Sequence, residues 1–200
     1  MQGIFAGRTQ LRYPYGRYGY TRGGGKIWHG GMDLVGSDST DIRMPYYKNK
    51  RITGRVVRAR RVTDHSNKTW EWGWYVCVQL DSAQTPDTVN FLYFAHCEKL
   101  LVQAGQTVTS GDALAVMGNT GNAAGGYKHC HLEVRATAGG TGLDPTAYAG
   151  CENAVGIYGA AAKLQTITIG PVSQGDADAV KALCDARGLT AAGLYTSKWA

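Results

Sequence analysis

Polar and apolar residues alternate along the first three quarters of the chain with the two-residue period of β-strands. Residues 52–62 and 73–80 are rich in β-branched and aromatic residues in near alternation, and the polar residues 63–72 between them are typical of a hairpin loop. Residues 88–96 form a further expected strand, which ends in a histidine. No amphipathic helix is indicated before the last quarter. The pattern therefore predicts a mainly β domain with an antiparallel sheet over residues 1–150.

Glycine and tyrosine, of which the chain has 28 and 12, reinforce this picture of a loop-rich β protein. Short apolar pieces in residues 101–108 and 110–118 are separated by glycines at turn positions. Residues 1–26 are especially rich in Gly, Tyr and Arg, and we expect them to form an irregular, partly ordered loop. Their interleaved aromatic rings and arginines could also stack on nucleic acid or sugar rings.

The composition changes after residue 150, and the change predicts two further parts. The Ala-rich residues 151–163 are expected to form a linker. In residues 164–200, a strand-like alternation precedes apolar residues at helical spacing over 174–187, with Ser173 as the N-cap. A second strand after this helix would complete a small α/β unit of βαβ type. Because so small a unit cannot cover both of its faces, it must pack on the β domain, on another chain, or on its own copy as a homodimer.

The chain carries a formal net charge of +6, which favours an anionic partner: nucleic acid, a membrane surface or an acidic cell wall. Its five cysteines form no CxxC pair, so neither a disulfide framework nor a zinc ribbon is indicated. No apolar run is long enough to span a membrane, and residues 1–12 lack the apolar core of a signal peptide. We therefore expect a soluble chain without membrane insertion and without an export signal of its own.

The sequence His129-Cys130-His131 is the strongest chemical feature of the chain. In a strand, His129 and His131 lie on one face, while Cys130 points to the other, where we expect the core. Two imidazoles on one face suit one metal ion and one proton carrier.

Catalytic zinc sites have three protein ligands and one open position. His29, Asp33 and one member of the His129/His131 pair would supply two nitrogens and one oxygen. The residues alone leave open which member binds. The histidines that stay uncoordinated, His96 among them, could then transfer protons or stabilise an oxyanion.

Four motifs occur in a fixed order between residues 25 and 148. They are His-Gly-Gly-Met-Asp (29–33), Tyr-Phe-Ala-His (93–96), Gly-Gln-Thr-Val-x-x-Gly (105–111), and Gly-Asn-Thr-Gly (118–121) followed by His-Cys-His-Leu-Glu-Val-Arg (129–135). In sequence and order they resemble the motifs of the M23 family of zinc metallopeptidases, the LytM and lysostaphin-like peptidoglycan endopeptidases.

The resemblance implies a LytM-like catalytic domain with one zinc ion bound by His29, Asp33 and His131. It implies that His96 and His129 are the uncoordinated catalytic pair. The family reaction is the attack of a zinc-bound water on a peptide bond of bacterial peptidoglycan, in a cross-link or a stem peptide. The basic charge then fits an anionic cell wall, and no nucleic-acid partner is expected.

The chain departs from the family pattern at Cys130, where leucine is usual. A thiolate is a good zinc ligand, but strand alternation points Cys130 away from the histidines. Glu133 stays on the histidine face, and we expect it to be a partner of a metal ligand or of Arg135 rather than a catalytic acid.

Three other functions stay open at this point. A catalytically inactive M23-like cell-wall-binding scaffold or amidase activator would usually lack ligands, whereas all five motif residues are present here. A lipoyl-like carrier would share the glycine pattern of residues 105–114 but would need a lysine at a hairpin tip, and none is there. A nucleic-acid binder would leave the histidines unexplained.

The same resemblance also bears on where the protein acts and on which bond it cuts. Because no signal peptide is seen, we expect either a phage-encoded enzyme, which reaches the wall through a holin or the virion, or a secreted enzyme with its signal trimmed. We expect the loops 37–50, 63–72 and 118–128 to select the bond that is cut. Residues 164–200 faintly resemble half of a SPOR-like peptidoglycan-binding module, which gives them a wall-binding role beside the dimerising one.

Overall fold

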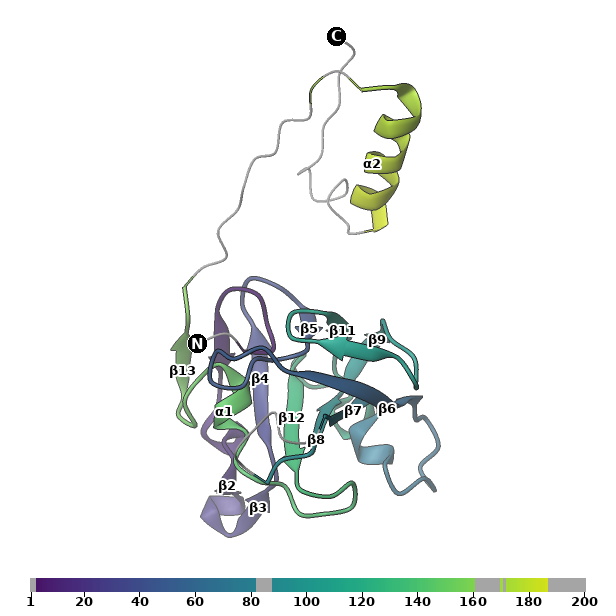
Figure 1. Cartoon of the computed structure of the whole chain (residues 1–200). Coiled ribbons are helices and arrows are strands. Elements are labelled where there is room, and N and C mark those ends of the chain that lie inside the picture. Colours follow the sequence, from purple (N-terminus) through teal and green to yellow (C-terminus); the bar gives the residue numbers. More distant parts are fainter. Residues whose placement is uncertain (1–2, 82–87, 161–169, 171, 187–200) are drawn as a thin grey trace. The chain divides into compact units, whose positions relative to one another are not determined.

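The computed structural model describes residues 3–81, 88–160, 170 and 172–186. The chain divides into two compact units, Met1–Lys163 and Leu164–Ala200. Each unit is described by itself (Figure 1).

An eight-stranded antiparallel sheet forms the frame of the first unit. From one edge to the other its strands are β10 (Thr107–Thr109), β6 (Thr53–Arg61), β7 (Trp74–Leu80), β8 (Phe91–Ala95), β12 (Cys130–Arg135), β4 (Met32–Gly36), β1 (Thr9–Leu11) and β13 (Gly156–Tyr158). The predicted mainly β, antiparallel fold is confirmed. The three expected strands correspond to β6, β7 and β8, and the β6–β7 link is a hairpin loop.

Two smaller sheets and several single turns of helix complete this unit. The smaller sheets are β5 (Asp41–Arg43), β11 (Ala113–Met117) and β9 (Cys97–Leu100), and the pair β2 (Gly19–Arg22) and β3 (Ile27–His29). The short helices are η1 (Pro14–Gly16), η2 (Gly23–Gly25), η3 (Trp70–Trp72), η4 (Gly121–Ala123) and α1 (Thr146–Ala149).

The core lies between the large sheet and the three-stranded sheet, which crosses one of its faces (Figure 1). Ile42, Leu114 and Met117 of the smaller sheet share one buried cluster with Phe94 and Leu132 of the larger one. Burial of such side chains, each worth about 1.5–3 kcal/mol, holds the two layers together. On β12, Cys130, Leu132 and Val134 enter this core, so the expected inward orientation of Cys130 is confirmed. Alternation turns His131, Glu133 and Arg135 to the opposite face.

The structure adds strands to both ends of this unit, where the sequence indicated a loop and a linker. Residues 1–26 are not simply an irregular loop, because β1 pairs with both β4 and β13, and β2 pairs with β3. Leu11 is fully buried, which explains why so short a strand is stable in the sheet. The expected linker 151–163 begins inside the domain, since Cys151 is buried and β13 forms an edge of the sheet.

The C-terminal unit contains the helix α2 (Gln174–Ala186), close to the predicted range. Ser173 caps it as expected: its hydroxyl oxygen accepts the Asp176 N–H at 3.2 Å and donates to the Asp176 carboxylate at 2.6 Å. The two expected strands, 165–170 and 189–199, fall almost wholly outside the described residues, and the wall-binding or dimerising role of this unit stays a prediction. None of the described helices is long and apolar enough to cross a membrane.

Candidate metal centre

Three neighbouring strands bring His29, Asp33 and His131 together. Strands β12 and β4 pair in a register that sets His131 directly opposite Asp33. His29 is the last residue of β3, and two glycines connect it to β4. The second glycine is required, because a Cβ atom at Gly31 would lie 2.3 Å from the Leu132 carbonyl oxygen and 2.8 Å from His131 Cε1. The chain can therefore turn tightly beneath the His131 ring.

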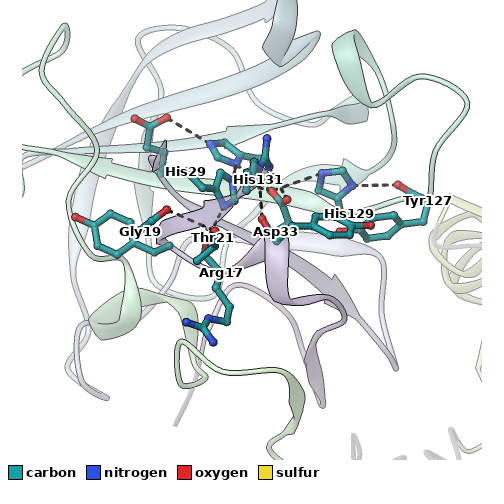
Figure 2. A network of polar contacts seen from close by, with 12 residues as sticks. Arg17, Gly19, Thr21, His29, Asp33, Tyr127, His129 and His131 are labelled. Carbon is teal, nitrogen blue, oxygen red and sulfur yellow. Dashed lines mark hydrogen bonds and ion pairs between the residues drawn. The ribbon is translucent and has the colours of Figure 1, made fainter. Parts of the chain in front are cut away.

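The three side chains point one donor atom each at a common centre (Figure 2). His131 Nδ1 lies 3.0 Å from Asp33 Oδ1 and 3.0 Å from His29 Nε2, and His29 Nε2 lies 3.3 Å from Asp33 Oδ1. Ligands about 2.0–2.1 Å from a tetrahedral zinc ion are about 3.3 Å apart, so the spacing and the N, O, N donor set both fit zinc. Within the described residues, this is the single group of three or more potential metal ligands.

Each of these residues is held from behind by a second partner. His29 Nδ1 donates to the Arg17 carbonyl oxygen at 2.8 Å, and His131 Nε2 lies 3.4 Å from Glu133 Oε2. The outer oxygen of Asp33, Oδ2, accepts a hydrogen bond from Arg22 Nη2 at 2.9 Å. These bonds fix the ring tautomers and leave His29 Nε2, His131 Nδ1 and Asp33 Oδ1 facing the centre.

Glu133 contacts both His131 and Arg135, as expected from its place on the histidine face of the strand. Its Oε2 faces His131, and its Oε1 accepts a hydrogen bond from Arg135 Nε at 2.8 Å. Arg135 therefore fixes the carboxylate that orients the His131 ring.

His96 and His129 lie beside this centre but outside the triangle of candidate ligands, His29, Asp33 and His131, which we call the ligand triangle. Their ring centroids are 4.8 Å apart, and His129 Nε2 is 3.7 Å from Asp33 Oδ1. His96 Nδ1 donates to the Thr120 carbonyl oxygen at 2.9 Å. His129 Nδ1 donates to the Tyr127 carbonyl oxygen at 3.0 Å (Figure 2). Because a carbonyl can only accept, both neutral rings carry the proton on Nδ1 and keep a lone pair on Nε2.

His96 also has an unusual backbone. Its φ of 62° lies in the left-handed region that favours glycine, at the turn between β8 and β9. Its backbone N–H donates to the Trp72 carbonyl oxygen at 2.9 Å, which holds this conformation. Backbone strain of this kind collects at functional sites.

A family model described as "Peptidase family M23" matches residues 29–145, more than half of the chain. The chain belongs to peptidase family M23. The matched range contains all five residues of the candidate site, so the resemblance expected from the motifs is confirmed at the level of the family.

Solved structures similar to this M23 domain include the catalytic domain of lysostaphin from Staphylococcus simulans, with 22% identity and a TM-score of 0.47 over 66% of this chain and 86% of that one. A mutant catalytic domain of the prophage-encoded M23 protein EnpA from Enterococcus faecalis gives 21% identity and a TM-score of 0.47 over 67% and 88%. LytU gives 20% identity and a TM-score of 0.48 over 69% and 82%.

The buried charges of the M23 site depend on one another. Burial alone would raise the pKa of Asp33, but hydrogen bonds from His131 and His29 hold it well below its usual range. Burial alone would lower the pKa of His131, but Asp33 and Glu133 raise it to about 9. Burial, together with the neighbouring His131 and His129, lowers the pKa of His96 to about 3. Burial also lowers the pKa of His129.

A cleft of about 750 Å³ opens onto this site. Two of the three loops expected to shape it do so: 63–72 contributes Glu71 and Trp72, and 118–128 contributes Asn122, Ala123 and Tyr127. The loop 37–50 contributes no lining residue, so that expectation was wrong. The N-terminal wall of the cleft was not predicted from the sequence; it consists of Tyr15, Arg22, Gly23 and Trp28. The only indication of it was the abundance of Tyr and Arg in residues 1–26.

Proposed function

We propose that this chain is a zinc-dependent endopeptidase that hydrolyses peptide cross-links or stem peptides of bacterial peptidoglycan. The observation that carries the proposal is the ligand triangle of His29, Asp33 and His131 with two further histidines, His96 and His129, in the same cleft. A zinc ion bound there would polarise the amide carbonyl and lower the pKa of a water molecule to about 7.

The chain's own residues supply the proton transfers. Hydrolysis forms a C–O bond, breaks the C–N bond and moves one proton from water to the leaving nitrogen. His96 and His129 are both neutral at neutral pH, because burial lowers both pKa values. Their Nε2 lone pairs are therefore available to take a proton as a base, and the resulting imidazolium can pass it to the leaving amine or stabilise the oxyanion.

Membership of family M23 and the net charge of +6 support peptidoglycan as the substrate class. The alternative is a catalytically inactive M23-like protein that binds the wall or activates an amidase. The presence of every ligand and of both uncoordinated histidines favours the enzyme, because a scaffold has no need of a buried zinc triangle. We place its action at the bacterial cell wall.

The test combines metal content with wall chemistry. Purified full-length chain is analysed for bound zinc and incubated with purified sacculi of several peptidoglycan types, and new amino groups are quantified. We expect about one zinc per chain and new amino groups from at least one type of sacculus. A chelator abolishes the release and added zinc restores it. Binding to sacculi without any new amino groups would instead support the scaffold.

A further inference from the structure

Arg22 brings a guanidinium into the cleft next to a candidate metal ligand. It is the last residue of β2, on the hairpin that leads through β3 to His29. Its Nη2 donates to Asp33 Oδ2 at 2.9 Å, and its Nε donates to the Tyr15 carbonyl oxygen at 3.3 Å. The guanidinium is thus held at two points, although the side chain of Arg22 is 39% exposed and that of Asp33 only 3%.

Most of the hydrogen-bonding capacity of Arg22 is unused. An arginine has five N–H donors, and Arg22 uses two of them. Its Nη1 has no hydrogen-bond partner within the described part of the chain. The remaining donors belong to a fixed, partly exposed cation that lines the cleft.

Arg135, the other arginine that lines the cleft, makes most of its contacts with the protein itself. Its Nε donates to Glu133 and its Nη1 to the Ala138 carbonyl oxygen, and its guanidinium lies 4.9 Å from the ring centroids of both Trp72 and Tyr93. Its side chain is 16% exposed. Arg135 therefore supports the site from within, whereas Arg22 is placed to meet a ligand.

We propose that Arg22 binds a carboxylate of the substrate beside the scissile bond and so selects the cross-link that is cut. A guanidinium with free donors pairs with a carboxylate through two parallel N–H···O bonds. The preferred substrate would carry a free carboxylate on the carbon attached to the scissile nitrogen. Cross-links through a diamino diacid have this group, and glycine bridges do not. The inference rests on the proposed function and narrows its substrate class.

The distances place this carboxylate site next to the reaction. Asp33 presents Oδ1 to the two ligand histidines and Oδ2 to Arg22, so one carboxylate separates the guanidinium from the candidate metal position. The carboxylate carbon of such a substrate is only three bonds from the carbonyl carbon that is attacked. Arg22 and the reacting carbonyl can therefore act on adjacent parts of one substrate.

The test uses two peptides that differ at a single group. Both contain the same scissile amide, and the carbon attached to its nitrogen carries a carboxylate in one and a carboxamide in the other. We expect the wild-type chain to favour the carboxylate peptide by about tenfold or more in kcat/KM. Arg22→Gln should bring the ratio close to one, and Arg22→Lys should give an intermediate ratio.

The control variant is Lys26→Gln, which removes the same charge from the same hairpin without touching the cleft lining. It should keep the wild-type ratio. Because Arg22 also holds Asp33, its variants are expected to bind zinc less tightly, but a ratio measured within one variant cancels any loss of zinc. Zinc content is measured alongside.

Failure of this inference differs from failure of the proposed function. Equal cleavage of both peptides by the wild-type chain, or an unchanged ratio in Arg22→Gln, would overturn carboxylate recognition and leave the endopeptidase intact. If neither peptide nor any sacculus is cut, the proposed function fails. In that case the dissociation constants of two uncleavable analogues, with carboxylate and carboxamide, still decide whether Arg22 recognises the carboxylate.

Discussion

The cleft contains two pairs of histidines that share one cavity but differ in what faces them. His29 and His131 face the carboxylate of Asp33, and His131 also faces Glu133. His96 and His129 donate from Nδ1 to backbone carbonyl oxygens, and His129 Nε2 lies 3.7 Å from Asp33 Oδ1, beyond hydrogen-bond distance. The pKa of His131 is raised to about 9, whereas the pKa of His96 is lowered to about 3.

Burial cannot explain this difference, because His131 is 8% exposed and His96 5%. Burial lowers the pKa of both rings, and only the carboxylates reverse its effect at His131. His131 thus gains its raised pKa from carboxylates that hydrogen-bond to it, whereas His96 and His129 have no carboxylate hydrogen bond among the described residues, and burial lowers both of their pKa values. Two histidines of one cleft therefore differ in pKa because their neighbouring groups differ, which is the division that the proposed metal ligand and the proposed base require.

The largest expected effect comes from the pair that faces carboxylates. His131→Ala removes one of the three candidate ligand atoms, so that only the donor atoms of Asp33 and His29 remain. We expect bound zinc to be lost, and peptidoglycan cleavage to fall by about 10³-fold or more. Zinc per chain after desalting and new amino groups from sacculi are the measurements. His65→Ala is the matched control, because His65 stacks on Trp70 outside the cleft lining. Retention of full zinc by His131→Ala would exclude it as a ligand.

The next effect tests the second pair. His96→Ala removes a neutral base but no ligand atom, so zinc content should stay at the wild-type level. We expect kcat to fall by roughly 10²–10⁴-fold, the usual contribution of general acid–base catalysis. If His96→Ala lost zinc as His131→Ala is expected to, the two pairs would not differ in metal binding, and the assignment of His96 as an uncoordinated base would be wrong. Activity equal to wild type would show that His129 alone moves the proton.

Part of the arrangement of the two histidine pairs could be predicted from local sequence. Strand alternation is enough to place His129 and His131 on one face and Cys130 in the core, and the structure confirms the orientation of Cys130. Alternation could not choose the ligand between the two histidines, because that depends on the register of β12 against β4, which pairs residues about a hundred positions apart in sequence. The family motifs supplied the choice.

The N-terminal wall of the cleft lay beyond sequence reasoning for a different reason. Arg22 belongs to a four-residue strand, and Tyr15 to a single turn of helix, too short for any periodicity. Their positions depend on contacts with distant residues, such as the hydrogen bond from Arg22 to Asp33. Composition showed many tyrosines and arginines in this region but not which of them reach the metal centre.

The smallest expected effect is a pH dependence of zinc affinity that arises from His131. Without metal, Asp33 and Glu133 raise the pKa of His131 to about 9, so His131 carries a proton at neutral pH that zinc must displace. Asp33 has a pKa well below its usual range and contributes no proton, and the lowered pKa of His96 means that it contributes none either. Apparent zinc affinity should therefore rise by up to about tenfold per pH unit from about pH 7, and level off above about pH 9.

Competition with a chromophoric chelator at each pH measures this slope, and calorimetry in buffers of different ionisation enthalpy counts the released protons. Glu133→Gln removes one of the two carboxylates that raise the pKa of His131, so the levelling-off should move to lower pH. Glu98→Gln is its control, since Glu98 is paired with Lys128 at the exposed surface. A flat profile between neutral pH and pH 9 in the wild-type chain would show that the carboxylates do not hold a proton on His131. The contrast between the two histidine pairs would then have to come from metal coordination alone.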